Sequence, residues 1–151
     1  MVNGSWLTVH DWLSQVTMLI DKKLLDEVAE RAKSSPRLRM NYNFHQSLDE
    51  KCHRFLNAVE PGTVVDIHRH LTKDETFVLL RGRVRVNTYY DDGSIMDSVE
   101  LSPDDGRYGM NIPKGVWHNL ESLETNSVFF ECKEVPYSLE DQEVMQIVEK
   151  E

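Results

Sequence analysis

Alternation of polar and apolar side chains at every second residue is the feature that most constrains the fold of this chain. It begins after Pro36, where the apolar set is Leu38, Met40, Tyr42 and Phe44 and the polar set is Arg37, Arg39, Asn41, Asn43 and His45. Consecutive side chains of a β-strand point to opposite faces of the sheet, so each set occupies one face. The pattern therefore predicts a strand over residues 37–45.

Further segments of strand character follow, and turn residues separate them. The predicted strands are Arg54–Val59, Thr63–Ile67, Thr76–Arg81, Arg83–Tyr90, Ser94–Leu101 and Ser127–Lys133. The turn signals are Pro61-Gly62, Arg81-Gly82, Asp91-Asp92-Gly93, Pro103-Asp104-Asp105-Gly106 and Pro113-Lys114-Gly115. Many short strands with a turn about every 8–12 residues are typical of a β-sandwich or β-barrel. The sequence thus predicts an all-β fold.

Helical spacing is confined to the ends of the chain. Asp21 is the predicted N-cap of a helix that continues to Ala32 and ends at Ser34-Ser35-Pro36, because the residue before a proline avoids helical geometry. The tail returns to helical spacing with acidic residues outward. We expect three parts: an N-terminal extension of residues 1–20, a β-rich domain of residues 21–138, and a C-terminal acidic helix of residues 139–151.

The charge of the chain narrows the classes of partner. Its 151 residues include 17 Lys and Arg against 26 Asp and Glu, a net charge of −9 that repels a nucleic-acid backbone or an anionic membrane. No apolar run approaches the roughly 20 residues of a membrane span, and no signal-peptide pattern is present, so we expect a cytoplasmic protein. Cys52 and Cys132 are too few for a disulfide framework and are expected as free thiols.

Three histidines and one glutamate form a candidate metal site. His68 and His70 project to the same face of a predicted strand, and Glu75 follows after a four-residue loop. His118 comes three residues after the last residue of the predicted turn Pro113-Lys114-Gly115. Three neutral imidazoles and a carboxylate suit a divalent transition metal such as zinc, iron, manganese or nickel. Four protein ligands leave positions open on an octahedral ion, as in catalytic sites. The alternative is a chain that keeps this arrangement without using a metal.

The spacing of these residues resembles the first signature of the cupin superfamily. Gly62 is followed after five residues by His68-Arg69-His70, after four more by Glu75, and after six more by Gly82. The run Pro113–His118 resembles the core of the second signature, although Asn119 follows His118 directly instead of three residues later. The resemblance implies a cupin β-barrel, a double-stranded β-helix or jelly roll, with short N- and C-terminal helices. It also implies a homodimer, because cupins commonly pair through barrel edges.

A more specific resemblance covers residues 20 to 137. It rests on Ser35-Pro36-Arg37-Leu38-Arg39, Asn41, Asn43-Phe44-His45, Leu56-Asn57-Ala58, Pro61-Gly62-Thr63, Phe129-Phe130-Glu131 and Pro136-Tyr137. These segments are similar to the WbuC family, small cupin-fold metalloproteins associated in bacteria with O-antigen and other surface-polysaccharide gene clusters. The resemblance implies a metal site and a link to polysaccharide metabolism, and it implies no settled reaction.

The polar face of the first predicted strand is the second candidate site. Arg37 and Arg39 carry forked donors that suit a carboxylate or phosphate, and Asn41 and Asn43 are placed to orient neighbouring hydroxyls. The face is either the mouth of a substrate cavity or a solvated edge strand, for which charged side chains are ordinary protection.

Proton transfer requires a further group. His45 is the candidate general acid or base, with Tyr137 or Tyr89 as its partner. Glu131 and Lys133 share one face of their strand and form either an inward polar pair or part of a solvated face.

These features favour a metal-binding cupin that acts on a small polar molecule, a saccharide or sugar-nucleotide derivative, by isomerase- or epimerase-type proton transfer. The metal would polarise a carbonyl or hydroxyl of the ligand. Two alternatives stay open: an Fe(II)-dependent dioxygenase, and a metal-dependent saccharide-binding module without turnover. A metal-free epimerase is disfavoured, because that chemistry has no need of the His68, His70, Glu75 and His118 set.

Overall fold

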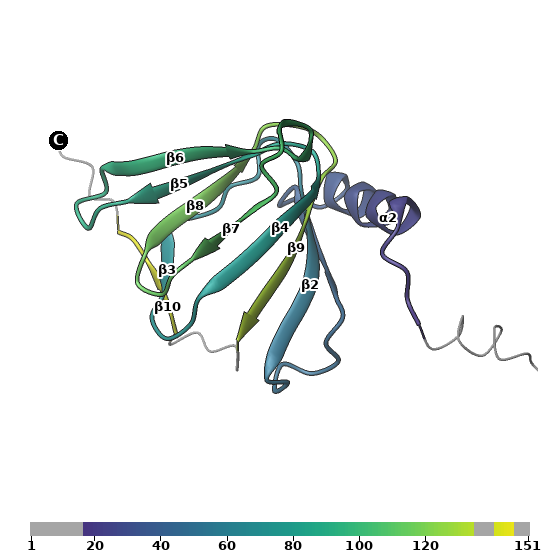
Figure 1. Cartoon of the computed structure of the whole chain (residues 1–151), viewed down its shortest axis with the longest axis horizontal. Helices are drawn as coiled ribbons and strands as arrows, with labels where there is room; N and C mark the ends of the chain where they lie inside the picture. The colour runs from purple at the N-terminus through teal and green to yellow at the C-terminus, as the bar shows by residue number, and fades with distance from the viewer. Residues whose placement is uncertain (1–16, 135–140, 147–151) are drawn as a thin grey trace, which may run out of the picture.

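The fold consists of two antiparallel sheets that face each other (Figure 1). A computed structural model describes residues 17–134 and 141–146. One sheet has the strand order β1-β2-β9-β4-β7 and the other has the order β10-β3-β8-β5-β6. The predicted all-β class is confirmed, and the double-sheet arrangement is that of the cupin fold.

The helix and most of the predicted strands are observed within a few residues of their predicted bounds. The helix is α2 (Lys22–Lys33), and a short 3₁₀ turn covers Pro103–Asp105. The strands are β1 (Arg39–Asn43), β2 (Cys52–Val59), β3 (His68–His70), β4 (Glu75–Arg81), β5 (Val84–Tyr89), β6 (Ile95–Leu101), β7 (Gly109–Ile112), β8 (Trp117–Ser122), β9 (Ser127–Glu134) and β10 (Gln142–Val144).

Helix α2 covers the outer face of the first sheet. It begins as predicted, since Asp21 Oδ1 accepts a hydrogen bond from the backbone N of Leu24 at 3.0 Å. Its apolar stripe packs on β2 and β9 in a buried cluster of Val28, Ala29, Ala32, Leu56, Ala58 and Val128. An ion pair of 2.5 Å between Asp26 Oδ1 and Arg81 Nη1 joins the helix to β4. The helix thus covers one face of these strands, and their other face is turned to the interior.

Apolar side chains fill one part of the space between the sheets. The buried cluster there consists of Val59, Phe77, Leu79, Val84, Val86, Leu101, Ile112 and Phe129. The turn between β4 and β5 requires glycine: Gly82 has φ +93°, and a Cβ at this position would collide with Ser127. Polar and apolar side chains together line the remaining interior, and its polar part contains the candidate site.

Two regions of the fold differ from the predicted strands. Residues 63–67 form no strand; pairing in this region begins at His68, and the Val64 side chain is exposed. Strands β7 and β8 were not predicted. Gly109 weakens the strand signal of β7, yet its missing side chain is what lets the backbone lie close to Phe77 of β4.

The C-terminal acidic helix predicted for residues 139–151 is wrong where the structure describes it. Residues Gln142–Val144 form β10, which pairs antiparallel with β3, so the sheet extends beyond the domain boundary placed at residue 138. The backbone groups of β3 need partners along that edge, and this requirement overrides a weak local preference for helix. Residues 1–16, 135–140 and 147–151 lie outside the described part of the chain. They include the predicted extension up to residue 16, as well as Tyr137.

Two smaller expectations concern the membrane and the thiols. None of the helices in residues 17–134 and 141–146 has the length and apolarity needed to cross a membrane. Cys52 and Cys132 are free thiols, as expected, with their Sγ atoms 3.3 Å apart between β2 and β9.

Candidate metal centre and ligand cavity

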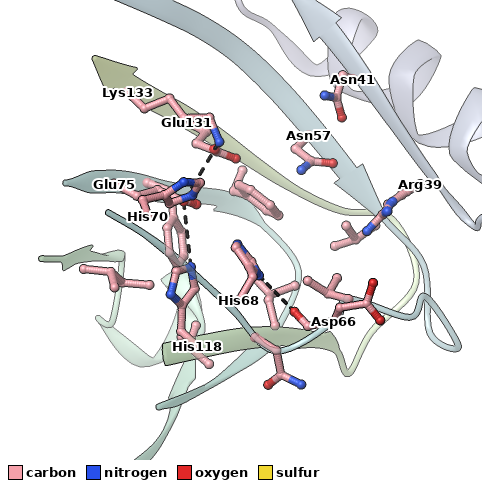
Figure 2. Close-up of a pocket in the computed structure, with 18 of the residues that line it drawn as sticks. Arg39, Asn41, Asn57, Asp66, His68, His70, Glu75, His118, Glu131 and Lys133 are labelled. Carbon is pink, nitrogen blue, oxygen red and sulfur yellow. Dashed lines mark hydrogen bonds and ion pairs between the residues drawn. The ribbon is translucent and has the colours of Figure 1, made fainter. Parts of the chain in front are cut away.

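The four predicted metal-binding residues converge in the polar part of the interior (Figure 2). Strand β3 carries His68 and His70, β4 begins with Glu75, and β8 carries His118, which lies directly opposite His68 in the β3–β8 register. Each residue offers one ligand atom, and these atoms all lie within 4.8 Å of one another. Antiparallel pairing thus brings together residues that are up to 50 positions apart in the sequence.

Hydrogen bonds orient the imidazole rings. The Nδ1 atoms of His68 and His118 lie 2.9 Å from the backbone carbonyl oxygens of Asp66 and Val116. A ring whose Nδ1–H donates to a carbonyl presents a bare Nε2 on its other side. The Nε2 atoms of His70 and His118 lie 2.8 Å and 3.8 Å from Oε2 of Glu75. The arrangement therefore directs ring nitrogens and a carboxylate toward a common point.

The electrostatics of the pocket favour the protonation states that bind metal. Burial, followed by the nearby His118, lowers the pKa of His68 to about 4. Burial opposes ionisation of Glu75, but the His118 and His70 imidazoles and the Lys133 ammonium outweigh it and hold the Glu75 pKa well below its usual value. At neutral pH, His68 is thus neutral and Glu75 is ionised, as metal coordination requires.

Unpaired buried nitrogen atoms support the fit of a metal ion. Within the described part of the chain, His70 Nδ1 and His118 Nε2 are buried without a hydrogen-bond partner. Buried polar groups are normally satisfied, and coordination to an ion would satisfy His118 Nε2. Mixed imidazole and carboxylate donors suit zinc, iron, manganese or nickel. The residues of this cluster therefore fit a divalent transition metal.

A cavity of about 360 Å³ extends from the cluster toward β1. Its lining includes Arg37, Arg39 and Asn41 from the predicted polar face. In Figure 2, Arg39 and Asn41 lie across the cavity from His70 and Glu75. These three residues therefore line the cavity, and β1, which carries Arg39 and Asn41, is also an edge strand of its sheet.

Two other residues of the polar strand do not line the cavity. Strand β1 ends at Asn43, and the chain then turns back toward β2. There the His45 ring stacks on His53, with ring centroids 4.2 Å apart, and His45 Nδ1 lies 3.1 Å from the backbone O and 3.3 Å from the backbone N of Arg54. The structure therefore does not bring Asn43 and His45 to the ligand cavity.

Tyr89, the other candidate partner for proton transfer, also lies outside the cavity lining. Its hydroxyl donates a hydrogen bond to Asn119 Oδ1 at 2.9 Å.

Glu131 and Lys133 form the inward polar pair that the sequence left as one of two possibilities. Both line the cavity, and Lys133 Nζ lies 2.5 Å from Glu131 Oε1 and 3.9 Å from Glu75 Oε2. Burial, followed by the charge of Glu75, raises the pKa of Glu131 to about 8. A buried carboxyl of this kind holds or releases a proton near neutral pH.

Sequence reasoning missed Asn57 as a cavity residue. It lies in β2 between buried Leu56 and Ala58, and its Oδ1 is buried without a partner among the described residues. Its position in the sequence could have indicated this, because an amide side chain in an otherwise apolar strand is costly to bury unless it has a hydrogen-bond partner.

Similarity to solved structures defines the fold class. The chain resembles the capsular polysaccharide assembling protein CapF from Staphylococcus aureus, with a TM-score of 0.60 and 20% identity over 72% of this chain and 30% of that one. It also resembles an oxalate decarboxylase from Lactobacillus farciminis in a formate complex, with a TM-score of 0.54 and 12% identity over 71% and 31% of the two chains. A third structure is a putative sugar phosphate isomerase from Acidithiobacillus ferrooxidans, with a TM-score of 0.52 and 17% identity over 64% and 59%. These likenesses support the cupin fold, and the chain spans about a third of the first two proteins.

Family membership follows from the sequence itself. Residues 20–101 match the family described as a domain of unknown function, DUF6016, and the chain belongs to this family. A comparison with curated proteins finds no match.

Proposed function

We propose that this protein is a metal-dependent cupin, similar to the WbuC family, that acts on an anionic saccharide or sugar-nucleotide derivative by isomerase- or epimerase-type proton transfer. The observation that carries the proposal is one cavity with the His and Glu cluster on one side and two arginines on the other. Two compared structures support the saccharide class, since their descriptions mention capsular polysaccharide assembly and a sugar phosphate isomerase.

The arginine side of the cavity is suited to an anionic group. Arg37 and Arg39 present planar guanidinium groups, which bind carboxylate or phosphate through paired hydrogen bonds. Asn41 and Asn57 lie on the same side and offer donors and acceptors to hydroxyl groups. Because the whole chain carries a net charge of −9, an anionic ligand must be attracted by these local groups against the overall field.

The opposite side supplies the chemistry. A divalent metal held by His68, His70, Glu75 and His118 would act as a Lewis acid toward a carbonyl or hydroxyl oxygen. We assign proton transfer to Glu131, whose carboxyl is buried in the cavity wall and contacts the Lys133 ammonium. Glu131 takes this role in place of His45, because a general base must reach the proton that it abstracts.

Metal content tests the ligand set. The double variant His68→Ala/His118→Ala should purify without bound metal, whereas wild type should contain about one metal ion per chain. Inductively coupled plasma mass spectrometry measures the metal content. His45→Ala is a matched control, because it removes a buried imidazole outside the cavity. Stoichiometric metal in the double variant would contradict the assignment.

Ligand binding and proton exchange test the substrate side. Sugar phosphates and nucleotide sugars should bind wild type, and Arg37→Ala/Arg39→Ala should weaken binding about 10-fold or more, since charge-assisted hydrogen bonds contribute about 1.5–3 kcal/mol each. Arg54→Ala is the control, because that arginine pairs with Glu50 on the surface. In D₂O, a bound substrate should exchange a carbon-bound proton, and Glu131→Gln should abolish this exchange. Tight binding with no exchange and no product would indicate a binding module instead.

A further inference from the structure

His70 differs from the other two histidines of the cluster in how its outer nitrogen is held. The Nδ1 atoms of His68 and His118 face backbone carbonyls at 2.9 Å, whereas His70 Nδ1 has no hydrogen-bond partner among the described residues. The carboxylate oxygen Oδ2 of Asp141 lies 3.7 Å from this nitrogen, and the Lys73 ammonium lies 3.0 Å from the same oxygen. A buried imidazole nitrogen without a partner therefore faces a buried carboxylate beside the candidate metal centre.

Asp141 is held firmly in this position. Its Oδ1 accepts a hydrogen bond from the backbone N of Thr72 at 2.9 Å and another from the Thr72 hydroxyl. The ammonium of Lys73, itself buried, lies 3.0 Å from Oδ2. The Asp141 side chain is only 7% exposed, so these donors replace water and stabilise its charged form. A buried carboxylate with such support is an effective acceptor for an imidazole N–H.

Strand β10 places this carboxylate next to the ring. Gln142 pairs with His70 in the β10–β3 register, and the Asp141 carbonyl accepts a hydrogen bond from Leu71 N at 2.9 Å. Beside it, Glu143 Oε2 lies 2.6 Å from the Arg69 guanidinium. The segment that the sequence predicted as a separate helix is therefore attached along the strand that carries two of the four candidate ligands.

We propose that Asp141 is a positioning residue of the metal centre: it accepts the Nδ1–H of His70 and so keeps Nε2 bare and directed toward the ion. This inference rests on the metal binding proposed above. Histidines that bind metals commonly donate their second N–H to a carboxylate or a carbonyl, which fixes the tautomer and increases the basicity of the ligating nitrogen. With Asp141, each imidazole of the set has an Nδ1 acceptor, and the third acceptor is the residue directly before β10.

The test is the Zn²⁺ affinity of the metal-depleted full chain, measured by competition with a chelating dye. Asp141→Asn should weaken Zn²⁺ binding about 10- to 100-fold, because it removes the carboxylate that faces His70. The amide oxygen of the asparagine still provides a hydrogen-bond acceptor for Thr72. Glu143→Gln is the matched control: it removes a carboxylate two residues away that pairs with Arg69 and not with His70. We expect this control to change the affinity less than about 3-fold, as is usual for a partly exposed ion pair.

A double-mutant cycle separates positioning from general destabilisation. If Asp141 acts through His70, Asp141→Asn should change the affinity less than about 2-fold in a His70→Ala background. An equal loss in both backgrounds, or a wild-type affinity of Asp141→Asn, overturns the inference while the metal site stands. Failure of wild type to bind Zn²⁺ overturns the metal site as well.

A measurement on wild type alone covers the case in which Asp141→Asn does not fold. Long-range ¹H–¹⁵N spectra of the Zn²⁺-loaded protein report which nitrogen of each histidine carries a proton. We expect a proton on His70 Nδ1, and a His70 that binds through Nδ1 overturns the inference.

Discussion

Replacing His68 by Asn tests the electrostatics of the site through the pH dependence of folding. Burial and His118 lower the pKa of His68 from 6.5 to about 4 in the folded metal-free protein, whereas the unfolded chain keeps a value of about 6.5. The unfolded state therefore binds the proton more readily. The stabilising contribution of neutral His68 is complete above pH 6.5 and is lost as the pH falls toward 4. With about 1.36 kcal/mol for each pKa unit, lowering the pH from about 7.5 to 5 should cost about 2 kcal/mol through His68 alone.

Urea denaturation of chelator-treated protein, followed by tryptophan fluorescence, measures this effect. Between about pH 7.5 and 5, wild type should lose about 2 kcal/mol more stability than His68→Asn, equivalent to a midpoint difference of about 1 M urea. The other titrating groups are present in both proteins, so the difference between the two losses isolates His68. Equal losses in the two proteins would refute the lowered pKa.

Packing, backbone geometry and buried hydrogen bonds give three further predictions, each measured by denaturation of the metal-free protein at neutral pH. Leu56→Ala removes a fully buried side chain beneath α2 and should cost about 2–5 kcal/mol; a loss below about 1 kcal/mol would contradict tight packing there. Gly82→Ala should destabilise by more than about 1 kcal/mol, because φ is +93° and the added Cβ meets Ser127; wild-type stability would show that the turn has another conformation. Glu60→Ala should cost about 1–3 kcal/mol, since Glu60 Oε1 accepts a hydrogen bond from the backbone N of Asn126 at 2.8 Å; an unchanged midpoint would mean that this N–H finds another acceptor.

Local pattern predicted the elements whose signal is long and regular. The helix begins after Asp21 as expected, because the cap and the apolar spacing both lie within one short stretch of sequence. The strand predicted as Thr76–Arg81 is observed as Glu75–Arg81, because its strand pattern likewise lies within one short stretch of sequence. Strands β7 and β10 escaped prediction, because they have only four and three residues and exist through pairing with a distant strand.

The four candidate metal ligands could be named from the sequence, since their spacing along the chain resembles a known signature and their chemistry suits a metal. Alternation along a strand also indicated that Arg37, Arg39 and Asn41 share one face. It could not indicate where β1 ends, and this end separates His45 from the cavity.

Local sequence patterns were enough to establish the all-β class, the helix cap, and which side chains of a strand share a face. Each of these depends on a few neighbouring residues, because the periods of helices and strands are local properties. Tertiary packing determined which faces turn inward, so that Asn57, Glu131 and Lys133 line the cavity. It also decided that the C-terminal segment pairs with β3 and places Asp141 beside His70. Those outcomes depend on which strand edges need backbone partners. The partners lie about 70 positions apart in the sequence, as Thr72 and Asp141 do, so a local pattern of residues cannot indicate them.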